Sequence, residues 1–390
     1  MEISERLRSI KPSATLSVNA KTLELRSQGV DIVSLAVGEP DFPTPAHICQ
    51  AAQAAIAEGF TRYTAVPGIA PLRQAVGHYY ERHYGIAVPQ EAVIVSNGGK
   101  HALYNLMQAL LNPGDSVLIP APYWVSYPDM VALAGAQPVI VPAGVEKDFK
   151  VTPAMLEAKR LPSTRMLIMN SPSNPTGAVY TPDEFNAIMQ WAIDNNLFVI
   201  SDEIYDQLVF APARMTSALP WWQRYPEQVA VVNGVAKSFA MTGWRVGYTV
   251  AHPDLVKKLS VLQGQCTSNV CSIAQKAALA ALEGSYDCVA NMNKAFLRRR
   301  DIAYNTVCSW KKARSPRPDG AFYIFADVRE YFCEGMANSA ELCTRLLEEA
   351  HVALVPGVAF GDDNCIRFSY AVSDAVLVES LNHIAAVLDK

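Results

Sequence analysis

The chain contains 390 residues, of which 50% are hydrophobic and 18% charged, so it can bury a large core and has the length of about two domains. Its formal net charge is -4 and its longest basic run is three arginines at 298–300, which argues against nucleic acid as a partner. No apolar run approaches the roughly 18 residues of a membrane span. Residues 1–6 lack the charged-then-apolar order of a signal peptide, so we expect a cytoplasmic protein.

The first 45 residues hold an amphipathic segment at residues 18–26 and a proline-rich stretch at residues 33–45. Prolines at positions 40, 43 and 45 forbid a helix there and predict a stiff loop. Gly38 lets the backbone of this loop come close to a small group. A loop that touches a ligand and a plain linker between domains both fit this stretch.

Between residues 45 and 251 helical and strand patterns alternate, which predicts an α/β fold with a mainly parallel sheet covered by helices on both faces. The expected strands are seven short β-branched or apolar runs at residues 93–95, 117–119, 139–141, 166–169, 198–200, 229–232 and 246–250. Helical patterns separate most of them, as at residues 100–111, 126–134 and 181–195. Because the link at 237–246 is too short for a crossover helix, we expect the last strand to be antiparallel.

Three long helical patterns follow, and we expect the last of them to bridge two domains; they cover residues 253–262, 272–282 and 286–310. A smaller α+β unit comes next, with strands expected at 321–328, 352–355 and 365–370 and helices at 339–351 and 373–388. The pattern divides the chain into a large domain at 46–300 and a small domain at 301–390. We expect the N-terminal segment 1–45 to be part of the small domain and to supply the loop beside the substrate.

The eight cysteines are scattered and include no Cys-x-x-Cys spacing. Cys266 and Cys271 are close in sequence, but no His or further Cys is grouped around them. We expect the cysteines to be reduced and mostly buried, and we expect no bound metal.

Polar residues follow several of the expected strands, at the edge where open α/β sheets bind ligands. Residues 96–100 (Ser-Asn-Gly-Gly-Lys) end a strand and open a helix, so Gly98 and Gly99 leave backbone donors free to hold an anion. Their spacing excludes a nucleotide P-loop, and a plain helix cap is the alternative. Asp202 closes another strand with Tyr205 three residues later, where an exposed helix start is the alternative.

Two further strand ends carry candidate ligand-binding side chains. Asn174 lies in a loop that Pro172 and Pro175 stiffen, so its amide is presented rigidly unless the segment is only a tight turn. Trp124 follows the run Pro-Ala-Pro at residues 120–122, where its indole can stack on a flat aromatic ring or pack in the core.

Lys237 follows an apolar strand and a glycine turn, and Arg245 comes eight residues later. Apolar neighbours disfavour the ammonium form, so the pKa of such a lysine falls and its neutral amine can condense with an aldehyde. A guanidinium such as that of Arg245 can hold a phosphate through two parallel hydrogen bonds. The residues alone leave an exposed surface lysine as the alternative.

Residues 236–248 (Ala-Lys-Ser-Phe-Ala-Met-Thr-Gly-Trp-Arg-Val-Gly-Tyr) resemble the pyridoxal-phosphate lysine region of class I aminotransferases, and residues 201–205 (Ser-Asp-Glu-Ile-Tyr) resemble the pyridine-binding motif of that family. The resemblance covers essentially the whole chain. It implies fold type I of the pyridoxal-phosphate-dependent transferases, with the cofactor bound covalently to Lys237 in the large domain. It also assigns the other cofactor contacts: Asp202 at the ring nitrogen, Tyr205 and Asn174 at the phenolic oxygen, Trp124 on the ring, and Gly98, Gly99, Lys100 and Arg245 around the phosphate.

Within that family the chain looks most like the bacterial aspartate aminotransferases, a subgroup that includes enzymes acting on prephenate. The resemblance implies that Arg367 binds the α-carboxylate of the substrate and that Tyr63 reaches the phosphate in the neighbouring subunit of a homodimer. The other substrate contacts it implies are Gly38, Trp124, Asn174 and, for a side-chain carboxylate, Lys100 with the hydroxyls of Ser13 and Thr15. Gly234 and Ala236 depart from the family, because many relatives carry hydroxyls there beside the phosphate.

The predicted reaction is the reversible transfer of the amino group of L-aspartate to 2-oxoglutarate, giving oxaloacetate and L-glutamate. Lys237 is then the general base that moves the proton from the substrate Cα. Prephenate or an aromatic amino acid is the alternative substrate. A lyase with the same cofactor and a non-catalytic protein that binds it share most of these residues, so both stay open.

Overall fold

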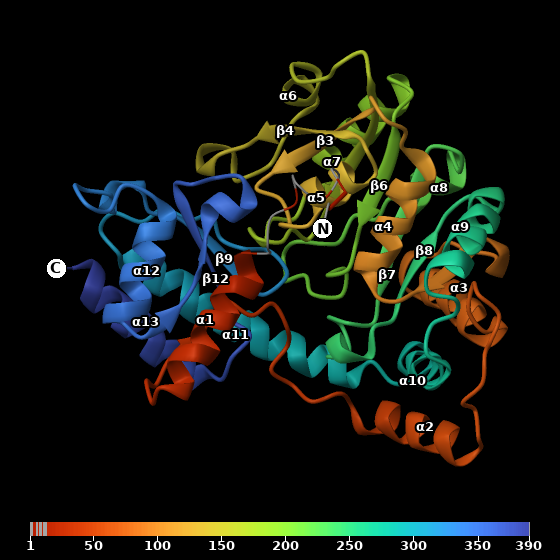
Figure 1. Ribbon diagram of the computed structural model, residues 1–390, viewed down its shortest axis with the longest axis horizontal. Coiled ribbons are helices and arrows are strands. Elements are labelled where there is room, and N and C mark those ends of the chain that lie inside the picture. The colour runs from red at the N-terminus through yellow and green to blue at the C-terminus, as the bar shows by residue number, and fades with distance from the viewer. Residues whose placement is uncertain (1–2, 5–6, 8–9, 11–13, 390) are drawn as a thin grey trace.

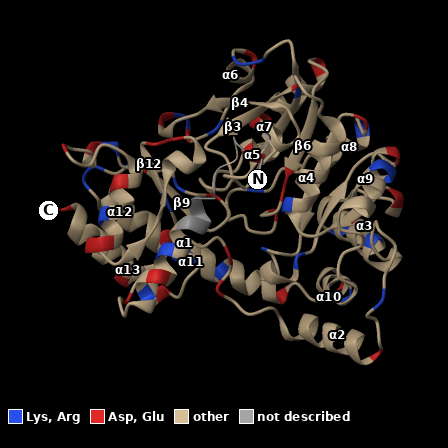
Figure 2. Cartoon of the chain, in the orientation of Figure 1, with Lys and Arg blue, Asp and Glu red and all other residues tan. Residues whose placement is uncertain are grey.

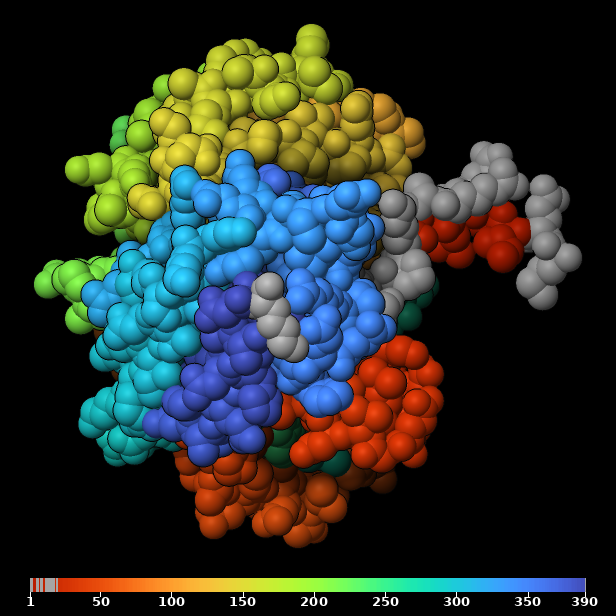
Figure 3. All heavy atoms as spheres, turned by 90° about the vertical axis from the view of Figure 1, so that its left-hand side faces the viewer, coloured from red at the N-terminus to blue at the C-terminus, as the bar shows by residue number. Residues whose placement is uncertain are grey.

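The computed structural model describes residues 3–4, 7, 10 and 14–389, with the side chains of 14–17 and 19 excepted. A large α/β unit and a C-terminal α+β unit pack against each other, as Figure 1 shows. Turned by 90°, the C-terminal unit faces the viewer in blue, below the yellow layer that holds β4 and α6 (Figure 3).

The large unit is built on one seven-stranded sheet in the order β2-β8-β7-β6-β5-β3-β4. Its strands are β2 (Val93–Ser96), β3 (Ser116–Ala121), β4 (Gln137–Pro142), β5 (Thr164–Asn170), β6 (Phe198–Asp202), β7 (Val229–Gly234) and β8 (Gly247–Val250). β3 to β7 run parallel, whereas β8 is antiparallel to both of its neighbours. The predicted fold class, including the final antiparallel strand, is therefore confirmed.

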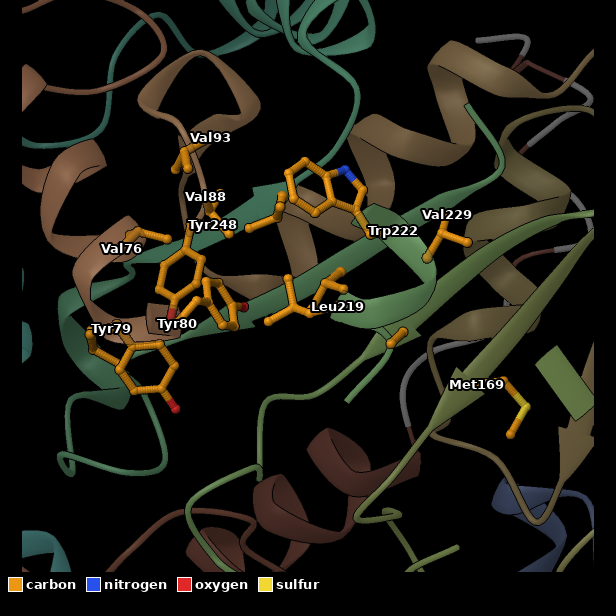
Figure 4. Close-up of a cluster of buried hydrophobic side chains, with 14 of the residues drawn as sticks. Val76, Tyr79, Tyr80, Val88, Val93, Met169, Leu219, Trp222, Val229 and Tyr248 are labelled. Atoms are coloured by element: carbon orange, nitrogen blue, oxygen red, sulfur yellow. The ribbon is translucent and has the colours of Figure 1, made fainter. Parts of the chain in front are cut away.

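Helices cover both faces of this sheet because alternate strand residues point to opposite sides. Val229 and Val231 of β7 belong to one core cluster, which α3, α7, α8 and α10 close, and Figure 4 shows part of it around Tyr80, Leu219 and Trp222. Ala230 and Val232 belong to a second cluster on the other face, under α4, α5 and α9. The helices of the unit are α2 (Ala46–Ala57), α3 (Ala70–Tyr84), α4 (Gly99–Leu110), α5 (Tyr127–Leu133), α6 (Pro153–Glu157), α7 (Pro182–Asp194), α8 (Leu219–Arg224), α9 (Pro253–Cys266) and α10 (Ser272–Glu283).

The C-terminal unit has a three-stranded antiparallel sheet, β11 (Val355–Pro356), β12 (Cys365–Ser369) and β9 (Tyr323–Asp327). Helices α1 (Ala14–Ser27) and α12 (Ser339–Glu349) pack against this sheet, and α13 (Asp374–Leu388) packs against α12. The N-terminal stretch belongs here too: β1 (Val33–Ser34) pairs with β10 (Val352–Ala353), Leu35 N–H donates to the Ala353 carbonyl, and Ser369 N–H donates to the Leu35 carbonyl. Residues 33–35 are thus held by the far end of the chain.

The single strand predicted at 352–355 is wrong, because the segment is shared between two sheets. Val352 and Ala353 pair with β1, whereas Val355 and Pro356 pair with β12. An apolar run in the sequence does not say with which strand each residue pairs, so the division could not be seen there.

Helix α11 (Asp287–Ser309) links the two units, as its course in Figure 1 indicates. Val289 in its first turn belongs to the core of the large unit. From Met292 and Phe296 onwards its buried residues belong to the core of the C-terminal unit. The helix therefore packs in both cores, while the domain boundary at residue 300 stays a prediction.

All eight cysteines are free, but only Cys343 and Cys365 are buried, so the expectation that most are buried is wrong. The four exposed ones lie at helix ends or in loops outside both cores: Cys266, Cys271, Cys308 and Cys333. Acidic and basic residues are interspersed over the helices (Figure 2). In the described ranges no helix is both long and apolar enough to cross a membrane.

Candidate active site

A cavity of about 450 Å³ opens at the carboxyl ends of the parallel strands, between the large sheet and the C-terminal unit. Side chains from both units line it. Those that the sequence predicted are Gly38, Gly99, Lys100, Trp124, Asn174, Asp202, Tyr205, Lys237, Arg245 and Arg367. The parallel sheet explains this convergence, because its strand ends meet at one edge.

Lys237 lies three residues beyond the end of β7 and points into the cavity. Its Nζ donates a hydrogen bond to the carbonyl of Gly38 and lies 5.8 Å from the centre of the Tyr205 ring and 5.7 Å from that of Phe322. Burial among these rings lowers the pKa of Lys237 to about 8, against the opposing effect of the Glu39 carboxylate. A neutral amine is therefore accessible at mildly alkaline pH.

Asp202 is the last residue of β6 and is buried. The Tyr127 hydroxyl donates to its Oδ2 at 2.6 Å, and the Ile204 N–H donates to its Oδ1 at 3.3 Å. Burial raises the pKa of Asp202 to about 6, while the hydrogen bond from Tyr127 works in the other direction. Near neutral pH the carboxylate is thus ionised and can face a protonated nitrogen.

Asn174 and Arg367 meet across the two units. The Nη1 of Arg367 donates to Oδ1 of Asn174 at 3.0 Å, and its Nη2 donates to the Ala36 carbonyl at 2.6 Å. Asn170 holds the Asn174 loop, because its Oδ1 accepts from the Asn174 N–H at 2.9 Å. Among the described residues the buried Nε of Arg367 has no hydrogen-bond partner, so it can receive an anionic ligand.

The turn before α4 forms a small cradle with Arg245. Gly98 has φ +85°, a conformation that strains any other residue, and a Cβ added to it would lie 2.5 Å from Nη2 of Arg245 and would displace the guanidinium. The first N–H groups of α4 open toward the same place, where a helix N-terminus favours an anion. Arg245 is itself held by a hydrogen bond from its Nη1 to the Thr242 carbonyl at 2.9 Å.

Gly234, where the family resemblance led us to expect a hydroxyl, lies against the neighbouring strand. A Cβ on Gly234 would lie 2.9 Å from Cα of Gly247 in the neighbouring strand β8. A serine or threonine is therefore excluded at this position without movement of β8. Ala236 lines the cavity and is not explained in this way.

Lys100 stands in the first turn of α4, where its ammonium lies 4.9 Å from the centre of the Trp124 ring. Partial burial and the charge of Arg245 lower the pKa of Lys100. Trp124 in turn packs edge-on against Tyr127, with ring centres 5.4 Å apart. The cation and the indole thus share one side of the cavity.

Not every predicted residue lies in this cavity. Tyr63 does not line it, and 89% of its surface is exposed. Ser13 and the side chain of Thr15 lie outside the described residues. Tyr127 and Tyr323 also line the cavity but were not predicted, because neither belongs to a motif and only the packing of α5 and β9 brings them there.

A family profile described as aminotransferase class I and II matches residues 30–384. The chain belongs to this family of aminotransferases. The aspartate/prephenate aminotransferase of Cereibacter sphaeroides is 44% identical over 391 residues, which cover 98% of each chain, and the aspartate aminotransferase of Geobacillus stearothermophilus is 42% identical over 385 residues, also 98% of each. The solved aspartate aminotransferase of Thermus thermophilus with maleate is 40% identical, with a TM-score of 0.93 over 99% of this chain and 100% of that one.

Membership of the class I and II aminotransferases implies pyridoxal 5′-phosphate as cofactor. The residues in the cavity fit this group. Lys237 can react with its aldehyde, Asp202 is a buried carboxylate for its ring nitrogen, and the glycine cradle with Arg245 suits its phosphate. Among the described residues no group of three or more His, Cys, Asp or Glu side chains is arranged to bind a metal.

Proposed function

We propose that this aminotransferase catalyses the reversible transfer of the amino group of L-aspartate to 2-oxoglutarate, giving oxaloacetate and L-glutamate. One observation carries the proposal: Arg367 and Lys100 come from different units and line the same cavity as Lys237. Two cations around one reactive amine suit a substrate with two carboxylates. The printed names of the relatives from Cereibacter and Geobacillus support the same substrate.

In this proposal Lys237 holds the cofactor covalently, Asp202 faces its ring nitrogen, and Tyr205 and Asn174 bind its phenolic oxygen. Trp124 stacks on the ring, while Gly98, Gly99 and Arg245 surround the phosphate and leave Lys100 for the side-chain carboxylate of the substrate. When bound, the cofactor supplies an electron sink for the bond that breaks at the substrate Cα. The ionised Asp202 serves that chemistry by keeping the ring nitrogen protonated, since a carboxylate beside a cation stabilises its charge.

Arg367 binds the α-carboxylate and fixes the orientation of the substrate. No described residue bonds its Nε, and Asn174 and the Ala36 carbonyl hold the other two guanidinium nitrogens in place. Lys237, once released as a free amine, moves the proton at the substrate Cα as a general base. The carbonyl of Gly38 and the rings of Tyr205 and Phe322 hold this amine in the cavity where the substrate binds.

Prephenate or an aromatic amino acid is a second candidate substrate. The observation that favours it is the apolar wall beside Lys100, where Leu103, Trp124 and Val125 line the cavity. The name of the Cereibacter relative includes prephenate as well as aspartate. Activity with aspartate and with prephenate, each measured against the same 2-oxo acid, separates the two candidates.

We also propose a homodimer in the cytoplasm, in which Tyr63 of each subunit reaches the phosphate bound to the other. Tyr63 is 89% exposed in the single chain and does not line the cavity of its own subunit. Mixing a Lys237→Ala variant with a Tyr63→Phe variant tests shared sites, because the hybrid dimer then contains one site with neither substitution. Sedimentation of the purified protein measures its oligomeric state directly.

The decisive experiment incubates the pyridoxal-phosphate-loaded protein with aspartate and 2-oxoglutarate and follows oxaloacetate through malate dehydrogenase and NADH. We expect oxaloacetate and glutamate in equal amounts and no free ammonia. Release of ammonia would instead indicate a lyase. No turnover with any amino donor would leave a protein that only binds the cofactor.

A further inference from the structure

Tyr323, the first residue of β9, joins two candidate site residues that the sequence treats as unrelated. Its hydroxyl lies 2.8 Å from the hydroxyl of Tyr205. Its ring lies under the guanidinium of Arg367, 4.6 Å from Cζ to the ring centre. All three side chains are buried, and Tyr205 belongs to the large unit while the other two belong to the C-terminal unit.

The strand register fixes this arrangement. Arg367 pairs with Phe325 in the antiparallel sheet, so Tyr323, two residues away on the same strand, is its diagonal neighbour on the same face. The Tyr323 hydroxyl also limits the Gly38 loop, because a Cβ on Gly38 would lie 2.6 Å from it. Tyr323 is therefore held from three sides, and its hydroxyl is aimed at Tyr205.

The direction of the hydrogen bond follows from what each hydroxyl must do. A tyrosine hydroxyl has one proton to donate and can also accept. In the proposed function Tyr205 uses its proton on the phenolic oxygen of the cofactor, so toward Tyr323 it can only accept. Tyr323 then has to be the donor, and donation to an oxygen strengthens the bond that the same hydroxyl gives onward.

We propose that Tyr323 is a positioning residue that donates a hydrogen bond to Tyr205 and thereby strengthens the bond from Tyr205 to the phenolic oxygen of the cofactor. This inference rests on the proposed function, since it requires the cofactor on Lys237. In this arrangement the C-terminal unit binds the substrate carboxylate through Arg367. Through Tyr323 it also stabilises the negative charge on the phenolic oxygen of the cofactor.

The charged and titratable groups around this chain of bonds come from several elements. They are Asp202 on β6, Lys237 after β7 with Glu39 and Arg245 near it, and Arg367 on β12. Tyr323→Phe leaves all of them in place and keeps the ring under Arg367. The substitution therefore removes one hydroxyl and no charge.

The test is the pH titration of the absorbance of pyridoxal phosphate bound to Lys237, without substrate. A stabilised phenolate lowers the midpoint of this titration, so Tyr323→Phe should raise it by about half to one pH unit. The matched control is Tyr370→Phe, which removes another buried hydroxyl of the C-terminal unit, one that donates to the Ala321 carbonyl at 3.2 Å. The control should titrate like the wild type.

A double-mutant cycle decides whether Tyr323 acts through Tyr205. In a Tyr205→Phe background the further change Tyr323→Phe should leave the midpoint unmoved. An equal shift in both backgrounds, or no shift in either, would overturn the inference while leaving the proposed function intact. If wild-type protein binds pyridoxal phosphate without attaching it to Lys237, which borohydride reduction and peptide mapping reveal, both the proposed function and this inference are wrong.

Discussion

The edge of the seven-stranded sheet and the face of the three-stranded sheet both line the cavity, but they supply its side chains in different ways. At the large sheet each group lies at or just beyond the end of a different strand, as Asp202 ends β6 and Lys237 follows β7. At the small sheet Arg367 stands within β12 and Tyr323 begins β9, side by side on one face. The first arrangement depends on where strands end, and the second depends on how two strands are aligned.

The two arrangements respond differently to structural change. A strand-end residue is carried on a turn, so its position tolerates changes elsewhere as long as its own strand stays in the sheet. A residue on a strand face moves to the opposite face if the register slips by one. The large sheet is thus suited to hold the reactive groups Asp202 and Lys237. The small sheet is suited to hold Arg367 and Tyr323, whose positions depend on the alignment of β9 with β12.

The largest expected effect concerns the amine at the edge of the large sheet. Lys237→Ala should abolish turnover, a loss of several orders of magnitude, because it removes both the covalent attachment and the general base. The oxaloacetate assay measures the loss, and Lys150→Ala, on a lysine paired with Glu184, is the control. Borohydride trapping of the cofactor on another lysine would contradict the assignment.

Asp202→Ala comes next and should lower kcat by several orders of magnitude while leaving the fold intact, because an unprotonated ring is a poor electron sink. Asp202→Glu should be milder. Burial holds the pKa of Asp202 near 6 in the cofactor-free protein. A protonated ring nitrogen beside this carboxyl favours its ionised form, so we expect the loaded wild type to keep Asp202 ionised, and to lose no activity through its protonation, as pH drops to about 6. A near-normal rate in the alanine variant would mean that Asp202 does not keep the ring nitrogen protonated.

Arg367→Ala tests the face of the small sheet. Truncating a buried, hydrogen-bonded charge should reduce kcat/KM roughly 10²- to 10³-fold. The loss should be similar for aspartate and for an aromatic amino acid, because both have an α-carboxylate. A loss confined to aspartate would mean that Arg367 binds the side-chain carboxylate instead.

The buried carboxylate of Asp202 should also lower the free energy of unfolding. The pKa of Asp202 is about 6 in the fold against 3.8 for a free aspartate, so the folded chain holds this proton more tightly and stability falls as pH rises from about 4 to 6. Above pH 6 cofactor-free Asp202→Asn should be more stable than the wild type by about 3 kcal/mol, and the difference should vanish below pH 4. Urea unfolding at several pH values measures this, with Asp31→Asn on the surface as control.

Lys100→Ala should have the smallest effect. Loss of a partly desolvated contact to a carboxylate costs about 1.5 to 3 kcal/mol, or roughly ten- to a hundredfold in kcat/KM for aspartate and glutamate. The kcat/KM for an uncharged aromatic amino acid should not change. Equal losses on both kinds of substrate would assign Lys100 to the cofactor and leave the side-chain carboxylate to other residues.

The sequence predicted the large sheet and its strand ends because both depend on local patterns. β-branched runs mark the strands, and a parallel sheet brings their ends together without any further information. Tyr127 and Tyr323 could not be predicted, because a helix and a strand from elsewhere in the chain bring them to Asp202 and Tyr205. The glycine at 234 looked like a lost hydroxyl for the same reason: its contact with Gly247 is made across strands.

The pairing of β1 with β10 has a consequence for the order in which the protein is made. Val33 and Ser34 leave the ribosome more than 300 residues before their partners Val352 and Ala353. Gly38, which accepts the hydrogen bond from Lys237, follows directly on this pairing. The nascent chain can therefore complete its large sheet well before it can close the wall of the cavity, and it becomes competent to hold a substrate only after β10 has been synthesised.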